Sequence, residues 1–247
     1  LRPLPYRDQS RIAMIWMTDT NDKGETYDLP LSSGFFADIQ REATRFEAMA
    51  AFRGWPYALS SVGGGEVERV AGARVSPTLF RVLGVQPIAG GAFTQEHAVP
   101  GAPNVMVISH DLWQRRFGGD RSIVGKQVDL SGKTFTILGV MPAGFSFPRG
   151  AELPAAFQFA LRTDVWTPLV FDSNDLRNYG TQNLSAVGKL SGSAASAQAE
   201  LAGIMRRFLD ANAPRLKLSY RLVSLVDQAG QGVKKGLLIL FGAVMCV

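Results

Sequence analysis

Cysteine and histidine are almost absent from the 247-residue chain, which contains only Cys246, His97 and His110. A single cysteine cannot form a disulfide within the chain. The two histidines lie far apart, and neither occurs at the spacing that zinc sites use. His97 is expected in a solvated loop and His110 at the start of a helix. We therefore predict no metal and no cofactor. The lone cysteine does not identify the compartment, because a domain of this size can fold without disulfides even outside the cytoplasm.

Charged residues are also scarce: they make up 19% of the chain, and the net charge is +5. An average soluble domain carries about 25% charged residues. The basic residues occur as scattered pairs such as Arg115–Arg116 and Arg206–Arg207, with acidic residues between them. No basic stripe with interleaved aromatic residues is present, so we predict that the chain does not bind nucleic acid. A hydrophobic content of 46% is enough for a sizeable core.

The chain lacks an initiator methionine and a signal peptide, and it ends in eleven apolar residues, Leu237–Val247. A membrane-spanning helix needs about 20 apolar residues. We predict that residues 236–247 are the start of a truncated transmembrane helix, because a surface helix would include polar residues every few positions. A buried C-terminal helix or strand is the alternative. Lys234 and Lys235 would lie at the mouth of the span and could snorkel to the interface.

The pattern of apolar residues predicts an α+β fold in which helices and strands alternate. A β-α unit near the N-terminus and a β-α-β unit near the C-terminus are expected to pack together, with a strand-rich insertion between them. The expected helices are residues 33–46, 76–84, about 109–117 and 193–211. The expected strands are residues 11–17, 66–75, 104–108, 127–130, 133–140, 164–170, 183–190 and 216–226.

Local signals define several of these boundaries. Ser76, Pro77 and Gly84 are typical of the start and end of a short helix, and Ser109 is a typical N-cap. Ser131-Gly132 predicts a two-residue hairpin turn. Residues 47–75 are expected to form short strands around a turn. The triple glycine at residues 63–65 is interpreted as the tip of that hairpin, because no phosphate-binding motif follows it.

The most suggestive residues for catalysis are the neighbours Ser109, His110 and Asp111. No G-x-S-x-G motif is present, and adjacent side chains at a helix start do not converge into a relay. Ser109 is better interpreted as a helix cap, with Asp111 favouring the positive end of the helix. Asp172 and Asp175 lie in a polar loop and are expected to be solvated. We therefore predict no catalytic residue and no enzyme activity, with a secreted or membrane-anchored hydrolase as the alternative.

The four tryptophans admit two interpretations. Trp16, Trp55, Trp113 and Trp166 could line a ligand pocket, or they could pack in the core or between subdomains. Packing is the favoured interpretation, because large aromatic side chains dominate protein cores. A pocket or large apolar groove would instead favour a peptide- or lipid-binding module.

Five segments, taken in order, resemble a known family. They read LRPLPY at residue 1, VAGARVSPTLFRVLGVQP at residue 70, VISHDLWQRRFGGD at residue 107, IVGK at residue 123 and FTILGVMPAGFSFP at residue 135. Each segment alone is loose, but five in this order are fairly specific. Together they are similar to the MacB-like periplasmic core domain of FtsX-like ABC transporter permeases, in particular the large orphan permeases of acidobacteria and related soil bacteria.

The resemblance implies an extracytoplasmic domain between the first two membrane helices of an inner-membrane permease. It implies a mixed α/β porter-like subdomain made from residues 1–75 and 164–228, with a strand-rich, sabre-like subdomain, residues 76–163, inserted. The implied role is non-catalytic coupling of cytoplasmic ATP hydrolysis to substrate export or release. The implied partners are the protein's own transmembrane helices, a second permease copy or duplicated half, a cytoplasmic ATPase and, in some members, a periplasmic adaptor.

Overall fold

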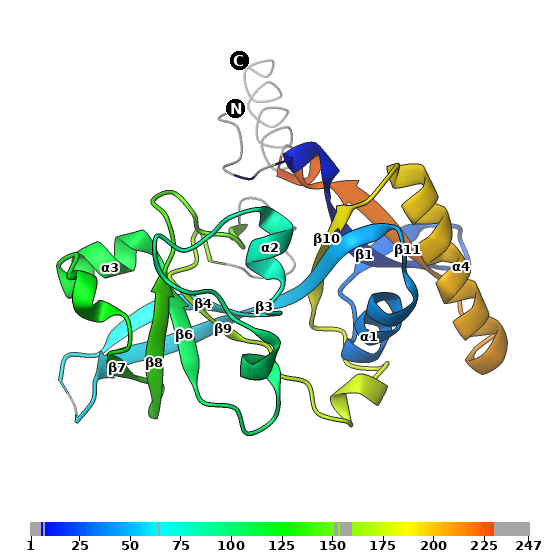
Figure 1. Ribbon diagram of the computed structural model, residues 1–247. Helices are drawn as coiled ribbons and strands as arrows, with labels where there is room; N and C mark the ends of the chain where they lie inside the picture. The colour runs from blue at the N-terminus through cyan, green and yellow to red at the C-terminus, as the bar shows by residue number, and fades with distance from the viewer. Residues whose placement is uncertain (1–5, 7, 64, 151–152, 154–159, 230–247) are drawn as a thin grey trace, which may run out of the picture.

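The computed structural model describes residue 6 and residues 8–63, 65–150, 153 and 160–229. Figure 1 shows an elongated molecule with two lobes, one bearing helices α1 and α4 and the other bearing α3. We call them the α4 lobe and the α3 lobe. Neighbouring strands are hydrogen-bonded from one lobe into the other and form one continuous sheet. This sheet, with few helices, confirms the predicted α+β class. The predicted membrane segment, residues 236–247, lies outside the described residues.

Eleven strands of the described chain form one mixed sheet. Their order is β11-β1-β10-β3-β4-β9-β6-β8-β5, with β2 paired to β1 and β7 paired to β3 and β8. The pairs β4–β9 and β6–β8 are parallel, and the other pairs are antiparallel. The strands are β1 (Ile12–Thr20), β2 (Thr26–Leu29), β3 (Phe46–Ser61), β4 (Glu68–Val75), β5 (Ala89–Gly90), β6 (Val105–Ile108), β7 (Gln127–Leu130), β8 (Lys133–Val140), β9 (Val165–Pro168), β10 (Ser185–Leu190) and β11 (Leu218–Ser224).

In the α4 lobe, the two ends of the chain share one part of the sheet. Strand β1 lies between β10 and β11, which is the association expected from the two end units. Helices α1 (Ser33–Glu42) and α4 (Ala194–Asn212) cover one face, and their buried residues recur at helical spacing. Phe36 and Ile39 from α1 meet Leu201 and Met205 from α4 in one apolar cluster. Burial of each such side chain contributes about 1.5–3 kcal/mol.

Strand β3 corrects two sequence-based expectations. The helix predicted over residues 33–46 ends at Glu42, and Phe46 begins β3 instead. The backbone amides of Thr44 and Arg45 donate to the carboxylate of Glu200 on α4, so a tertiary contact replaces the next helical turn. In place of short strands before residue 63, β3 runs unbroken for 16 residues and enters both lobes.

The α3 lobe packs helix α3 (His110–Phe117) against strands β3, β4 and β6 to β9. Leu112 and Trp113 are its buried residues. A third cluster lies mainly around the short helix α2 (Leu79–Leu83) and takes residues from both lobes, including Trp16 of β1 and Trp166 of β9. The two lobes therefore share part of their core as well as β3.

Predicted cap and turn signals act locally. Ser109 Oγ accepts from the amide of Leu112, so this serine is an N-cap as expected. Ser193 Oγ accepts from the amide of Ser196 and caps α4, whose start the sequence placed at about residue 193. Ser131 and Gly132 both have positive φ and join β7 to β8 in the predicted hairpin. The predicted start of α2 was wrong. The N-cap of this helix is Thr78, and the hydroxyl of Ser76 accepts instead from the amide of Ala51.

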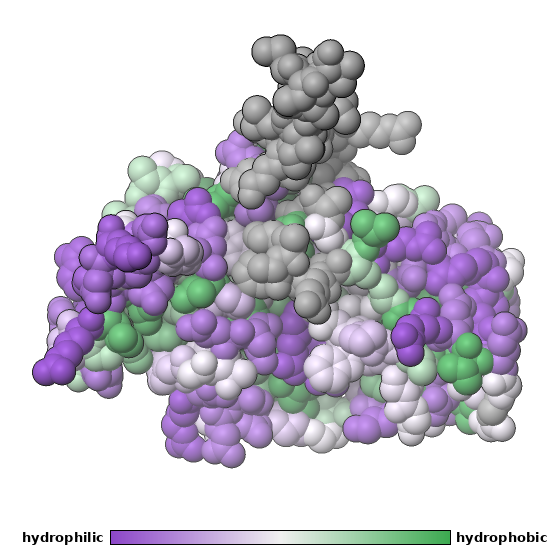
Figure 2. Space-filling view, turned by 180° about the vertical axis from the view of Figure 1, so that it is seen from behind, coloured by the Kyte–Doolittle hydropathy of each residue, from purple (hydrophilic) through white to green (hydrophobic). Residues whose placement is uncertain are grey.

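Polar residues cover most of the two ends of the molecule, with smaller apolar patches between them on the face shown in Figure 2. No helix within the described ranges is long and apolar enough to cross a membrane. The described ends of the chain lie side by side, because Ala13 of β1 pairs with Ser224 of β11. The chain therefore enters and leaves the fold in the same region.

Candidate functional site

Structural contacts occupy the Ser109 hydroxyl. Its oxygen accepts from the Leu112 amide at 3.1 Å, and it donates to Oδ1 of Asp164 at 3.3 Å. Ser109 is 4% exposed. A nucleophilic serine needs a base within about 3 Å of its hydroxyl and an open approach for substrate. The hydroxyl is buried and acts as a helix cap.

His110 does not serve Ser109 as a base. Its ring contacts the indole of Trp113 edge to face, with centroids 5.6 Å apart. Its Nδ1 lies 4.0 Å from the carboxylate of its neighbour Asp111. Asp111 in turn faces Arg162 at 3.7 Å. The three sequence neighbours thus have separate partners, as expected for adjacent residues at a helix start, and no relay forms among them.

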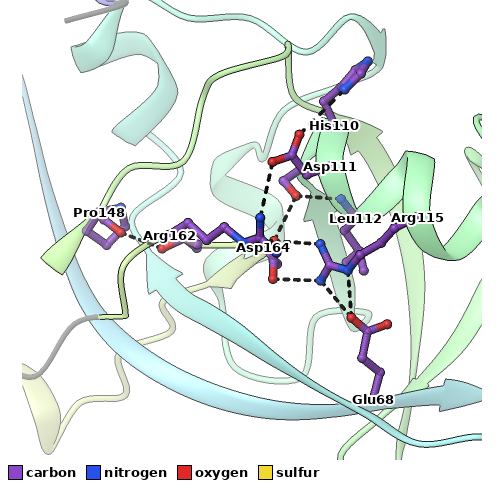
Figure 3. Close-up of polar contacts among 10 residues, drawn as sticks. Glu68, His110, Asp111, Leu112, Arg115, Pro148, Arg162 and Asp164 are labelled. Carbon is purple, nitrogen blue, oxygen red and sulfur yellow. Dashed lines mark hydrogen bonds and ion pairs between the residues drawn. The ribbon is translucent and has the colours of Figure 1, made fainter. Parts of the chain in front are cut away.

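Asp164, which the sequence did not single out, is the centre of this polar cluster. It is 5% exposed and receives two hydrogen bonds from the Arg115 guanidinium, at 2.9 and 3.3 Å (Figure 3). Arg115 also donates to Glu68, and Arg162 approaches Asp164 to 3.7 Å. Burial opposes the charge of Arg115, but its hydrogen bonds to Asp164 and Glu68 outweigh burial and raise its pKa. The cluster ties α3 to β4 and to the start of β9.

A small cavity of about 50 Å³ lies beside this cluster, lined by Ser109, His110, Asp111 and Asp164 among others. Its volume holds one or two water molecules. The arrangement therefore offers neither room for a substrate nor a paired nucleophile and base. Its chemistry is that of a buried ion-pair network, and it lends no support to the hydrolase alternative.

A larger cavity of about 390 Å³ opens on one face of the sheet. Its walls come from β3, β4, the loop after residue 95, the β7–β8 hairpin and the end of β9. We call it the junction groove, because it lies between two apolar clusters on one face of β3. Ala51 belongs to the cluster of the α4 lobe and Tyr57 to that of the α3 lobe. Trp55 lies between them on the same face of β3 and lines the groove.

The junction groove corrects two expectations about aromatic residues. Trp55 lines it and is 40% exposed, whereas Trp16, Trp113 and Trp166 are buried as predicted. His97 also lines it, from a 3-10 turn at Gln95–Ala98 and not from an open loop. Its Nδ1 accepts from the Thr94 amide at 2.9 Å, which holds the ring in place.

The remaining candidates have structural partners. Asp172 accepts from the amides of Asn174 and Asp175, so it organises the loop that the sequence assigned to solvent. No group of three or more histidine, cysteine or acidic residues is placed to hold a metal ion in the part of the chain that the structure describes.

Comparison with known proteins adds a family and a fold. The family model for the MacB-like periplasmic core domain matches residues 3–203. A domain of a Porphyromonas gingivalis protein described as a permease superposes with a TM-score of 0.63 at 21% identity, covering 89% of this chain and 91% of that one. The periplasmic region of MacB from Actinobacillus actinomycetemcomitans gives 0.58 at 13% identity, covering 90% and 92%. The extracellular domain of the noncanonic ABC-type transporter YknZ from Gram-positive bacteria gives 0.56 at 14% identity, covering 86% and 99%. No curated protein matches the chain in sequence.

Proposed function

The chain belongs to the MacB-like periplasmic core domain family, and on that premise we propose that it couples ATP hydrolysis in the cytoplasm to substrate export or release. Family membership makes it the periplasmic domain of an ABC-transporter-type permease. The coupling of ATP hydrolysis to export or release is what we propose beyond family membership. The domain acts by changing conformation and performs no catalysis of its own. Its partners are a cytoplasmic ATPase, its own transmembrane helices, a second permease copy or duplicated half and, in some assemblies, a periplasmic adaptor.

The observation that carries the proposal is the position of the two ends of the fold. Strands β1 and β11 run antiparallel side by side, with Ala13 opposite Ser224, so chain entry and exit lie together (Figure 1). A domain inserted between two neighbouring membrane helices needs this arrangement, because both helices must leave it toward one membrane. A movement of the two helices would reach the α4 lobe first.

We also propose how the movement travels. Residues 1–75 and 164–228 form the porter-like subdomain, and residues 76–163 form the sabre-like subdomain. Strand β3 extends from the α4 lobe into the α3 lobe, where Leu59 pairs with both Glu68 and Leu130. A continuous hydrogen-bonded strand transmits displacement better than a flexible linker would. The domain lies on the periplasmic side of the inner membrane.

Spin labels test the coupling in the whole transporter. The full permease and its ATPase are reconstituted with Cys246 replaced by serine and a label at Arg206→Cys on α4 or Gln127→Cys on β7, both exposed positions. We expect the distance distribution between the two copies to shift at one or both sites when ATP and vanadate trap the ATPase. Identical distributions with and without nucleotide would contradict the proposal. An ATPase variant unable to bind ATP is the control.

The coding sequence gives a second, independent test. We expect it to encode several membrane helices after Val247, within an FtsX-like permease unit, and one helix before Leu1. A reading frame that ends shortly after Val247 without a further apolar segment would refute the proposal. This test needs no knowledge of the transported substrate.

A further inference from the structure

An unusual pair of like charges lies beside the junction groove, and one member of the pair, Arg74, lines it. Arg53 of β3 lies directly opposite Arg74 of β4 in the antiparallel register. Like charges in directly opposed positions destabilise a strand pair. Both guanidiniums lie over the Trp55 ring, with Cζ 5.5 Å away for Arg53 and 4.1 Å for Arg74. The indole face attracts each cation but leaves their net positive charge uncompensated.

Among the described residues, no ion pair joins Arg53, Arg74 or Lys133 to an acidic side chain. The Nε of Arg53 is buried and has no hydrogen-bond partner. Burial, and then the charge of Arg74, lower the pKa of Arg53, while the charge of Asp175 opposes that change. A buried donor without a partner costs about 1–3 kcal/mol. The site therefore holds positive charge at a cost in stability.

The cavity next to this pair has the size and the lining of a ligand site. Its volume of about 390 Å³ falls within the range of small-molecule pockets. Arg74 and Lys133 contribute cations, and no acidic residue lines it among those that the structure describes. Its apolar walls are Trp55, Tyr57, Val99, Pro103, Val105, Leu130, Phe135, Pro168 and Val170.

Two neighbouring features keep the groove in shape. Gly72 leaves room for Tyr57, because a Cβ at that position would lie 2.4 Å from Cδ2 of the tyrosine ring. The Tyr57 hydroxyl is fixed by Thr167 Oγ1 at 2.7 Å. His97 accepts at Nδ1 from the Thr94 amide, so the proton of its neutral ring is on Nε2, which is then a further donor in the lining.

We propose that the junction groove binds a small amphipathic anion, with a carboxylate or phosphate group against Arg74 and Lys133 and an apolar body along Trp55 and Phe135. Guanidinium groups bind both kinds of anion through charge-assisted hydrogen bonds. An apolar body accounts for walls that a bare inorganic anion would leave uncovered. The site goes beyond the coupling function, and its test is independent of transport and of ATP hydrolysis.

Titration calorimetry on the 247-residue chain tests the proposal with octyl phosphate and octanoate as probes. We expect at least one of them to bind at a single site and to weaken as NaCl is raised, because salt screens exposed charges. Inorganic phosphate tests the head group alone, and octyltrimethylammonium tests the apolar chain with the opposite charge. Both are expected to bind at least tenfold more weakly, because inorganic phosphate lacks the apolar body and octyltrimethylammonium cannot make the charge-assisted contacts.

Variants then locate the bound anion. Arg74→Met keeps an apolar stem on Trp55 but removes the charge, and we expect it to weaken octyl phosphate or octanoate about tenfold. Arg74→Lys should retain most of the affinity. Arg69→Met is the matched control: Arg69 is exposed, lies on the same strand and is absent from the groove lining, so binding should stay within about twofold of wild type. Circular dichroism confirms that each variant is folded.

Four results would overturn the proposal. The first is equal binding of octyltrimethylammonium, which would make the site simply apolar. The second is equal binding of inorganic phosphate, which would make it a plain anion site. The third is unchanged affinity in a folded Arg74→Met, and the fourth is no binding of either anionic probe; both would leave the arginine pair without this role. None of these results bears on the spin-label experiment, so the two proposals fail separately.

Discussion

Individual residues of the α3 lobe are held by one buried carboxylate, Asp164. It accepts from Ser109 and Arg115, and its backbone carbonyl accepts from the Ser109 amide. A buried charge is stable only when its partners compensate for lost hydration. The residues that first suggested catalysis, Ser109 and Asp111, are thus the surroundings of a structural ion pair.

Replacing Asp164 with asparagine should destabilise the protein by about 3 kcal/mol, because Arg115 would lose its partly buried partner. Urea denaturation followed by fluorescence measures the change. Asp111→Asn is the control: its side chain is 59% exposed and 3.7 Å from Arg162, so its removal should cost less than about 0.5 kcal/mol. Equal effects of the two variants would show that Asp164 has no special role.

At the scale of the elements, Glu200 joins helix α4 to the start of β3. Its carboxylate accepts from the amides of Thr44 and Arg45, each at 3.0 Å, and from the Thr44 hydroxyl at 2.7 Å. Burial acts to raise the pKa of Glu200, but these hydrogen bonds outweigh it and lower that pKa. These hydrogen bonds therefore favour the ionised carboxylate, and ionised Glu200 stabilises the folded protein.

The lowered pKa of Glu200 predicts how the effect of Glu200→Gln on stability depends on pH. The pKa of Glu200 is lower in the folded protein. Its stabilising contribution is therefore complete above the pKa of the unfolded chain, about 4.3, and is lost as pH falls through the pKa of the folded protein. We expect the variant to be about 1 kcal/mol less stable at pH 7, since the site is partly solvated. Urea denaturation at a series of pH values should show the difference shrinking toward acid pH.

The control for this prediction is Glu96→Gln in the turn at Gln95–Ala98. Glu96 is exposed, and its substitution should change stability by less than about 0.5 kcal/mol at every pH. A gap between Glu200→Gln and wild type that persists unchanged below the folded pKa would rule out a contribution from the ionised group. The variant would then act through packing alone.

For the whole molecule, the sharing of β3 and of one apolar cluster predicts cooperative unfolding. The cluster around α2 combines Trp16 of the α4 lobe with Phe80 and Val105 from the intervening segment. Neither lobe can lose its structure without exposing part of the other's core. We therefore expect a single transition, although the shape in Figure 1 is elongated.

Fluorine NMR of protein labelled with 5-fluorotryptophan measures the unfolding of each lobe separately. Trp113 reports on the α3 lobe and Trp16 on β1, and single tryptophan-to-phenylalanine variants assign the signals. We expect both native signals to disappear at the same urea concentration. Loss of the Trp113 signal while the Trp16 signal stays native would show that the α3 lobe unfolds alone and would argue against rigid transmission through β3.

Much of the fold was predictable because its signals are local. The Ser109 and Ser193 caps, the Ser131-Gly132 turn and the apolar face of α4 depend on residues within a few positions of one another. The end of α1 was not predictable in this way, because Glu200 binds the two amides that follow it from more than 150 positions away. The unbroken length of β3 likewise depends on partners from distant segments.

The sequence by itself determined the α+β class, the segments that resemble the MacB-like family and the lack of a recognisable catalytic motif. Only the tertiary structure decided what lies beside what. Arg53 and Arg74 are 21 positions apart and unremarkable in sequence, yet strand register opposes them over Trp55. The physical reason is that caps and turns depend on neighbouring backbone, whereas a groove depends on register between strands, which the packing of the whole sheet sets.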